Sequence, residues 1–275
     1  MIETVGNVDP VGRSVMERLI DERFCRSACY REESKSTNSD ALADLRDQPL
    51  AEEWLPRLYL ADRQTSGRGR QGNSWLTGED ALTFSLVIDF DSVSEPHSRL
   101  LSLAAGVAIA RGIEFLFAPA KSRLKWPNDV YLAGGKVAGI LIETSQAFSN
   151  RLVMGVGVNV NESPAFPVLD ETAPPQSLYG ATGRRMSRFE VLEAMIQNLT
   201  EATEQLRQSP MIILTEFRNR CMLTGKQISF RESGDDCQGN CRGIADDGSL
   251  MIQTASGLRN CDSGAIRMVR VKRPF

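Results

Sequence analysis

The segment from Gln64 to Trp75, QTSGRGRQGNSW, combines glycines at 67, 69 and 72 with arginines at 68 and 70. Glycine permits unusual backbone angles and close approach of a ligand, and the arginine fork suits phosphate or carboxylate oxygens. The segment matches neither the G-x-x-x-x-G-K-[ST] phosphate loop nor the G-x-G-x-x-G dinucleotide fingerprint. We interpret it as an anion-binding loop. The alternative is a solvated basic loop, since exposed Arg-Gly segments are common.

A second group of polar residues lies in KWPND (125–129) and KVAGILIE (136–143). Lys125 is expected to end one strand, Asn128 and Asp129 to occupy a turn that Pro127 initiates, and Lys136 to start the next strand. The edge of an active site often has this arrangement. The alternative is a Pro-Asn-Asp turn flanked by lysines whose stems lie on apolar surface.

A third stretch, GVGVN (155–159), is an apolar strand that ends in Asn159. Its glycines weaken a strand unless something packs close to the backbone. Either a bound ligand or a crossing element of the protein would explain them.

Alternating and apolar patterns predict the elements that position these residues. Branched and apolar residues indicate strands over 57–62, 81–88, 123–126, 129–133, 136–144 and 151–160. Helical periodicity indicates helices over 11–23, from Ser36–Asn38 to before Pro49, over 98–117 between Pro96 and Pro119, from Ser187, and from Pro210 to before Gly225. Ser187 and Glu190 form an S-x-x-E capping box.

The last part of the chain has a different pattern of short alternating strands, at 227–232, 242–245, 249–254 and 265–271. We therefore predict an α+β fold: a mixed-sheet catalytic domain over residues 1–223 and a small β-barrel over residues 224–275.

The bulk composition excludes several classes of protein. A net charge of −3 and a pI near 5.5 argue against a nucleic-acid binder. No apolar run approaches the roughly 20 residues that span a bilayer, and the N-terminus shows no secretory signal, so we expect a cytoplasmic protein without membrane contact. The six cysteines include no C-x-x-C pair, which favours reduced thiols over zinc, and His97 is the single histidine. We therefore expect neither chemistry built on a histidine base nor a site with paired histidine ligands.

Taken together, GRGRQGNSW, KWPND, KVAGILIE and GVGVN stand in the order and spacing of the biotin-protein ligase family, which the chain resembles over nearly its whole length. Ser36-Thr37-Asn38 matches the family's upstream S-T-N. The resemblance implies a biotin/lipoate ligase type of mixed sheet followed by an SH3-like C-terminal domain. Only about 30 residues precede the S-T-N match, so we expect no helix-turn-helix domain and no repressor role.

The resemblance also implies a reaction in which biotin and MgATP give biotinyl-5′-AMP and pyrophosphate, and a lysine of a biotin carboxyl carrier domain then displaces AMP. Fixed cations are the expected catalysts. The implied catalytic residues are Arg68, Lys136 and Asp129. The implied biotin-binding residues are Ser36, Thr37, Asn38, Gln64, Gly67, Arg68, Gly69, Arg70, Lys136 and Gly139. The implied ATP and adenylate contacts are Arg68, Arg70, Trp75, Lys125, Asn128 and Asn159.

Several alternatives stay open at this level. Asp129 either deprotonates or orients the incoming amine, or it only caps its turn. Mg²⁺ is expected to be held by phosphate oxygens and waters, without a dedicated set of protein ligands. A lipoate-protein ligase and a ligand-binding module without turnover are the competing functions, and the sequence does not decide whether the chain forms a homodimer.

Overall fold

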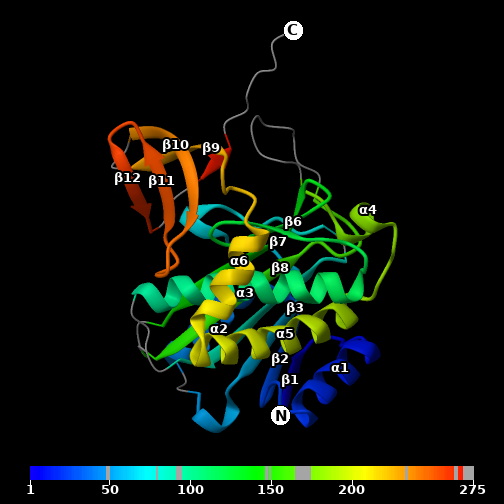
Figure 1. Cartoon of the computed structure of the whole chain (residues 1–275). Helices are drawn as coiled ribbons and strands as arrows, with labels where there is room; N and C mark the ends of the chain where they lie inside the picture. Colours follow the sequence, from blue (N-terminus) through cyan, green and yellow to red (C-terminus); the bar gives the residue numbers. More distant parts are fainter. Residues whose placement is uncertain are drawn as a thin grey trace.

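The structure is a computed structural model, and it describes residues 1–47, 50–78, 80–90, 95–145, 148, 150–164, 175–232, 235–262 and 266–268. Its larger sheet is 8-stranded, with the order β1-β2-β3-β4-β8-β7-β6-β5 (Figure 1). The strands are β1 (Ile2–Val5), β2 (Ser27–Ser34), β3 (Arg57–Gln64), β4 (Leu82–Asp89), β5 (Arg123–Lys125), β6 (Asp129–Leu132), β7 (Gly135–Thr144) and β8 (Arg151–Val158). The first three strands are parallel and the remaining neighbours are antiparallel, so the predicted mixed sheet is confirmed.

The smaller sheet is 5-stranded and antiparallel, with the order β12-β11-β10-β9-β13. It contains β9 (Gln227–Glu232), β10 (Asp235–Ile244), β11 (Leu250–Thr254), β12 (Gly257–Cys261) and β13 (Arg267–Met268). The short strand predicted at 242–245 is the end of the longer β10, and β12 was not predicted. Of the strand predicted over 265–271, Ala265 and residues 269–271 lie outside the described residues.

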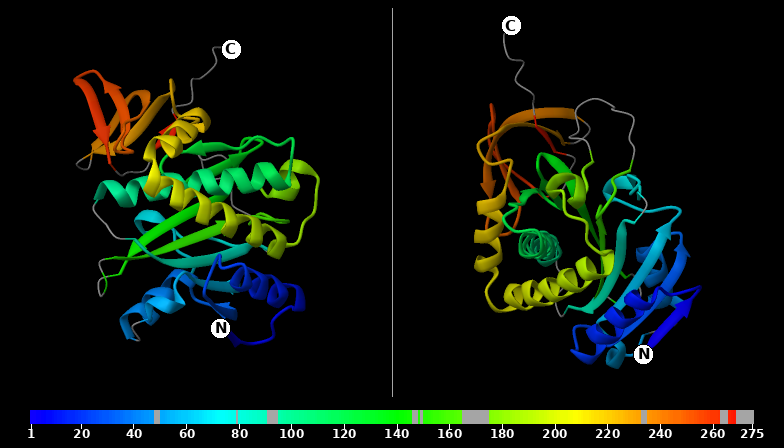
Figure 2. Two further views of the ribbon diagram at one scale, coloured as in Figure 1. Left: turned by 60° about the horizontal axis from the view of Figure 1, so that its bottom comes forward. Right: turned by 90° about the vertical axis from the view of Figure 1, so that its right-hand side faces the viewer.

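Helices cover the two faces of the large sheet unequally. They are α1 (Pro10–Asp21), α2 (Thr37–Asp47), α3 (Glu95–Leu116), α4 (Leu178–Thr182), α5 (Arg188–Gln208) and α6 (Pro210–Arg220). The long helices α3 and α5 pack together on one face with α1 and α6, whereas α2 contacts β3, β4 and β8 from the opposite face (Figure 2). The α2 face is therefore the more open one.

Strand alternation divides the core between these two faces. Leu58 and Leu60 of β3 belong to the main core with α3 and α5, and the residue between them, Tyr59, belongs to a small second core under α2. Leu152 and Met154 of β8 flank Val153 in the same way. This is the period of two expected of a strand, and it gives the α2 face few large apolar side chains. The resulting space is where polar side chains gather.

Local sequence signals explain most helix ends. Ser187 accepts a hydrogen bond from the Phe189 backbone, and Glu190 reaches back to the Ser187 backbone, so the predicted capping box is confirmed. The predicted start of α3 was wrong: this helix begins at Glu95 and includes Pro96. Proline lacks only an N–H that the first turn leaves unpaired, so it is compatible with that position.

No strand was predicted at β1 or β2. The β2 sequence SACYREES mixes charged residues with small ones, and its first four residues and Ser34 are buried, with Ala28 and Tyr30 in the main core. Backbone pairing with β3 is what makes this segment a strand. The parallel pairing joins residues far apart in sequence, so local patterning does not predict it.

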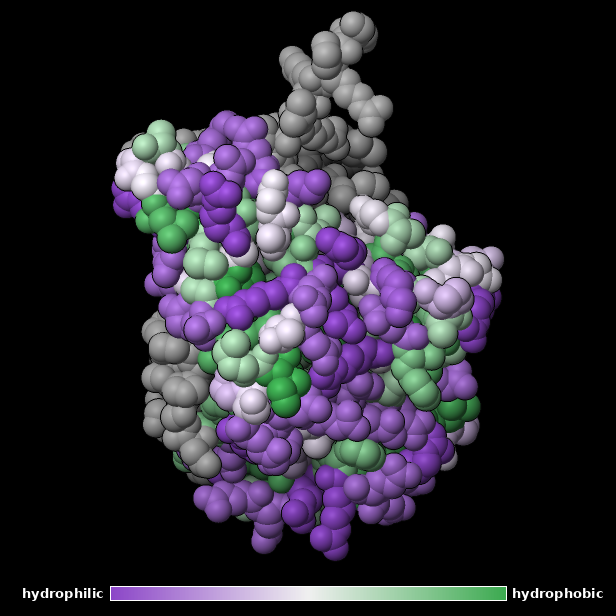
Figure 3. Space-filling view, viewed as in Figure 1, coloured by the Kyte–Doolittle hydropathy of each residue, from purple (hydrophilic) through white to green (hydrophobic). Residues whose placement is uncertain are grey.

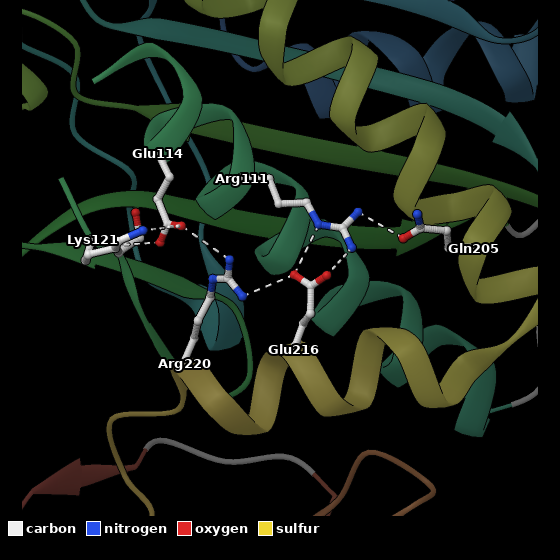
Figure 4. A network of polar contacts seen from close by, with 7 residues as sticks. Arg111, Glu114, Lys121, Gln205, Glu216 and Arg220 are labelled. Carbon is white, nitrogen blue, oxygen red and sulfur yellow. Dashed lines mark hydrogen bonds and ion pairs between the residues drawn. The ribbon is translucent and has the colours of Figure 1, made fainter. Parts of the chain in front are cut away.

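A polar network joins α3, α5 and α6 (Figure 4). Arg111 of α3 bonds both Glu216 of α6 and Gln205 of α5, and Arg220 bridges Glu216 and Glu114. These side chains are only partly exposed, so the network fixes the three helices relative to one another.

The small sheet packs against the large one through defined contacts. Trp126, 1% exposed, donates its indole N–H to the Gly248 carbonyl at 3.0 Å. Arg99 near the start of α3 pairs with Asp247 and Asp262 at 3.2 Å each. The turn between β10 and β11 is thereby attached to the hairpin that carries Lys125 and Asp129.

The described residues form no large apolar face on the side of the molecule on which α5 and α6 lie in front (Figure 3). Figure 3 shows this side as mainly hydrophilic, with small separate hydrophobic patches. Among the described helices, none is both long and apolar enough to cross a membrane.

Candidate functional site

A cavity of about 440 Å³ opens where the glycine-rich segment, the KWPND hairpin and strands β7 and β8 meet. Every site residue predicted from the sequence lines it, except Gly67 and Asn159. The structure therefore brings together the residues Ser36, Thr37, Asn38, Gln64, Arg68, Gly69, Arg70, Trp75, Lys125, Asn128, Asp129, Lys136 and Gly139.

One end of the cavity is a buried polar cluster at the start of α2. Ser36, Thr37 and Asn38 are each less than 5% exposed. The Gln64 side-chain carbonyl accepts from the Thr37 backbone at 2.8 Å, and the Ser85 hydroxyl contacts Thr37 and Asn38 at 2.7 and 2.5 Å. Mixed donors and acceptors held in this way suit a compact, neutral, urea-like group.

The glycine-rich segment folds back on itself as a short hairpin. The Trp75 backbone donates to the Gly67 carbonyl at 2.9 Å, and Gly69 donates to the Asn73 carbonyl at 2.7 Å. Gln71 and Gly72 turn the chain with φ of 55° and 75°. A Cβ at Gly67 would meet the Trp75 carbonyl, so Gly67 allows this fold-back and does not line the cavity.

The KWPND hairpin places its polar residues opposite the start of β7. Lys125 of β5 lies opposite Asp129 of β6 in the strand register of the hairpin. The Asn128 side-chain amide donates to the Ile140 carbonyl at 2.7 Å. Asp129 forms an ion pair with Lys136 at 2.6 Å. The Lys136 ammonium also lies 5.5 Å from the centre of the Trp75 ring.

Positive charge dominates the lining of the cavity. Its charged members are Arg68, Arg70, Lys125 and Lys136, against Asp129. Within the part of the chain that the structure describes, no ion pair holds Arg70. Burial lowers the pKa of Arg70, and the nearby Asp129 carboxylate opposes that effect. Such a cavity favours ligands that carry phosphate or carboxylate groups.

Glycines on β7 and β8 let side chains lie directly on the strand backbone. A Cβ at Gly155 would approach the Asn38 amide closer than 3.0 Å, and one at Gly157 would approach the Trp75 indole as closely. Gly139 faces both Trp75 and Lys136. The GVGVN glycines therefore accommodate side chains of the protein itself, and those side chains in turn line the cavity.

Asn159 lies just behind the cavity wall. Its amide nitrogen donates to the Gln176 carbonyl at 3.1 Å and approaches the Lys136 carbonyl at 3.5 Å. Its buried side-chain oxygen has no hydrogen-bond partner among the described residues. The Trp75 indole nitrogen is buried and unpartnered in the same sense.

The sequence-based site omitted two residues that the structure joins to it. Glu143 accepts hydrogen bonds from Asn38 and Arg68, at 2.8 and 2.6 Å, and Ser85 contacts the Thr37-Asn38 pair. Glu143 was visible in the sequence as the one carboxylate of KVAGILIE, in a largely apolar strand. Across the described residues, no three His, Cys, Asp or Glu side chains gather as metal ligands.

Comparison with known proteins gives matches of sequence and of structure. Residues 30–159 match the family model described as the biotin/lipoate A/B protein ligase family. The biotin--[acetyl-CoA-carboxylase] ligase of Mycobacterium tuberculosis is 33% identical, over 71% of this chain and 72% of its own length. The corresponding ligase of Paracoccus denitrificans is 30% identical, over 81% and 92%. A biotin protein ligase from Aquifex aeolicus, solved in complex with biotin and ATP, superposes with a TM-score of 0.74 at 25% identity, covering 88% of this chain and 99% of that one.

Proposed function

Because this chain belongs to the biotin/lipoate A/B protein ligase family, among its biotin protein ligases, we propose that its cavity binds biotin and MgATP. The protein joins these two substrates as biotinyl-5′-AMP and then transfers biotin to one lysine of an acceptor protein. The observation that supports this reaction best is the gathering of Arg68, Arg70, Lys125 and Lys136 in one cavity beside a buried polar cluster. The two substrates of the first step are both anions, and the cavity offers cations for both.

In the first step the biotin carboxylate attacks the α-phosphorus of MgATP, and pyrophosphate leaves with the electron pair of the broken P–O bond. Mg²⁺ enters with the nucleotide and neutralises phosphate charge. Arg70 and Lys125 are proposed to hold phosphate oxygens, and Lys136 to hold the attacking carboxylate. Cations fixed in position before the reaction lower its barrier without reorganisation.

The buried cluster of Ser36, Thr37, Asn38 and Gln64 is proposed to hold the ureido group of biotin. Its hydroxyl and amide groups already bond one another and so need little rearrangement. Gly69 and Gly139 line the cavity and are proposed to let the chain come close to the ligand, whereas Gly67 acts indirectly by allowing the segment to fold back.

Adenine is proposed to lie near Asn128 and the Trp75 indole. The Asn128 side-chain nitrogen donates to Ile140, which leaves the Asn128 side-chain oxygen to accept from the exocyclic amine of adenine. The engaged amide of Asn159 leaves only its side-chain oxygen for an adenine contact.

Asp129 has two candidate roles in the second step, in which a neutral lysine amine attacks the acyl carbon and AMP leaves. It accepts the proton of the amine, or it orients Lys136 through their 2.6 Å ion pair. An Asp129→Asn variant separates the two roles. If Asp129 accepts the proton, the variant transfers biotin slowly even from preformed adenylate. If Asp129 only orients Lys136, the variant mainly forms the adenylate slowly.

The domain division is also proposed: residues 1–223 as the catalytic domain and residues 224–275 as an SH3-like domain. The antiparallel order of the small sheet supports it, and Ile266 brings that part of the chain into the cavity wall. A biotin carboxyl carrier domain is the proposed acceptor. A homodimer, a cytoplasmic location and the lack of a nucleic-acid partner stay predictions.

The test is incubation of the purified protein with radiolabelled biotin, MgATP and a biotin carboxyl carrier domain, with lipoate as a parallel substrate. We expect label on the carrier, and its loss in a Lys136→Ala variant. Biotin binding without adenylate or transfer would contradict the proposal in favour of a binding module, and preference for lipoate would assign the other activity of the family.

A further inference from the structure

We propose that Glu143 is a positioning residue that couples the biotin-binding cluster to the arginine of the glycine-rich segment. The inference rests on the proposed function. Glu143 is not among the residues that line the cavity, so it acts on the ligands through Asn38 and Arg68. One carboxylate oxygen, Oε2, accepts from both.

Strand geometry explains how Glu143 reaches both partners. Gly139, Leu141 and Glu143 alternate along β7 and so project to one face of the sheet, the face of the cavity. Leu141 contributes a second contact, because its carbonyl accepts from the same Asn38 amide at 3.2 Å. Glu143 therefore lies two residues beyond Leu141, which lines the cavity, and its side chain is 23% exposed.

The Asn38 side of this contact is rigid. Asn38 is 3% exposed, its amide oxygen accepts from Ser85 at 2.5 Å, and it lies directly on the backbone of Gly155. The carboxylate of Glu143 is thus held from one side by a fixed donor.

The Arg68 side of this contact is more exposed. The Arg68 side chain is 40% exposed and belongs to a hairpin held mainly by its own backbone hydrogen bonds. The Arg68 Nη2 donates to the Glu143 carboxylate at 2.6 Å. Glu143 therefore transfers the fixed position of Asn38 to Arg68, and this keeps the hairpin over the cavity.

Two substitutions separate the parts of this role. Glu143→Gln keeps a carbonyl oxygen for Asn38 but removes the charge that holds Arg68, whereas Glu143→Ala removes both. Since hydrogen bonds to charged groups are roughly twice as strong as neutral ones, we expect Glu143→Gln to release biotinyl-5′-AMP about fivefold to tenfold faster, with biotin affinity within about threefold of the original. Glu143→Ala should weaken biotin binding about tenfold as well.

Glu193→Gln is the matched control. Glu193 of α5 pairs with Arg18 of α1 at 2.6 Å. The arginine side chain is 46% exposed and the glutamate 22%, against 40% for Arg68 and 23% for Glu143. The same substitution there weakens an ion pair of similar exposure away from the cavity, one that has two hydrogen bonds where Arg68 and Glu143 have one. It should change neither adenylate release nor biotin affinity.

A measurement on the ligand-free protein makes the test independent of turnover. We expect Glu143→Gln to speed hydrogen exchange at the Gly69 and Trp75 amides, or trypsin cleavage after Arg68, at least about threefold over wild type and the control. Unchanged exchange together with unchanged adenylate release would overturn the proposal. If the wild type forms no adenylate, the proposed function fails, and the exchange result alone then decides whether Glu143 holds the hairpin.

Discussion

Gly155 and Gly157 lie two residues apart on β8, and replacing each with alanine should have different consequences. A Cβ at either position would lie closer than 3.0 Å to a neighbouring side chain, which real Cβ atoms essentially never do. At Gly155 the neighbour is the Asn38 amide, and at Gly157 it is the Trp75 indole. The outcome depends on which neighbour can move.

Asn38 cannot move without loss. Displacing its amide breaks contacts to Ser85, Leu141 and Glu143 at 2.5, 3.2 and 2.8 Å, and each such bond contributes about 1 kcal/mol. If the strand shifts instead, overpacking costs about 1–3 kcal/mol. We therefore expect Gly155→Ala to lower the free energy of unfolding by about 2–4 kcal/mol, which corresponds to a fall in Tm of roughly 4–8 °C.

Trp75 lies in a hairpin and its buried indole nitrogen has no partner to lose among the described residues. Gly157→Ala should therefore displace the indole at a cost of about 1 kcal/mol, near the lower end of overpacking penalties. Biotin affinity should fall about a hundredfold or more in Gly155→Ala and stay nearly unchanged in Gly157→Ala, since only the first displaces the buried cluster.

Urea unfolding and calorimetric titration with biotin measure both quantities, and Trp75 fluorescence reports whether the indole has moved. The reasoning is refuted if Gly157→Ala is the more destabilised variant, or if both variants bind biotin alike. Either result would mean that Asn38 is less constrained than its contacts indicate.

Two further predictions concern the charged side chains. Arg68→Gly should release biotinyl-5′-AMP and label lysines of a bystander protein such as serum albumin, detectable on a blot with labelled avidin; full retention of the intermediate would count against a closing role for Arg68. Glu216→Gln should destabilise the protein at pH 7 by about 1 kcal/mol, because the hydrogen bond from Arg111 lowers the Glu216 pKa below its usual 4.5. That stability is present above about pH 4.5 and is lost as the pH falls through the lowered pKa, so unfolding curves of variant and wild type should converge in acid. A difference in stability that does not shrink as the pH falls below 4.5 would contradict the assignment.

The chemistry of the site was readable from local sequence. Arg68, Arg70, Lys125 and Lys136 stand in short motifs whose residue types suit anionic ligands, and the structure places all four in one cavity. Strands and helices with strong apolar periodicity, such as β4, β8, α3 and α5, were predicted nearly in full, because their burial is written into their own residues.

The contacts between distant residues were not predictable from local sequence. Glu143 and Asn38 are 105 residues apart in sequence. The buried Arg57 guanidinium is paired with Glu3 of the unpredicted β1 at 2.7 Å, and it also donates to Ser27 and Tyr59. From the sequence, either a bound ligand or a crossing element of the protein could explain Gly155 and Gly157. In the structure, Asn38 packs on Gly155 and Trp75 packs on Gly157. Residue chemistry and local periodicity can therefore be read along the chain. Ion pairs, close backbone contacts and parallel strand pairing arise between distant segments and depend on how the sheet is ordered.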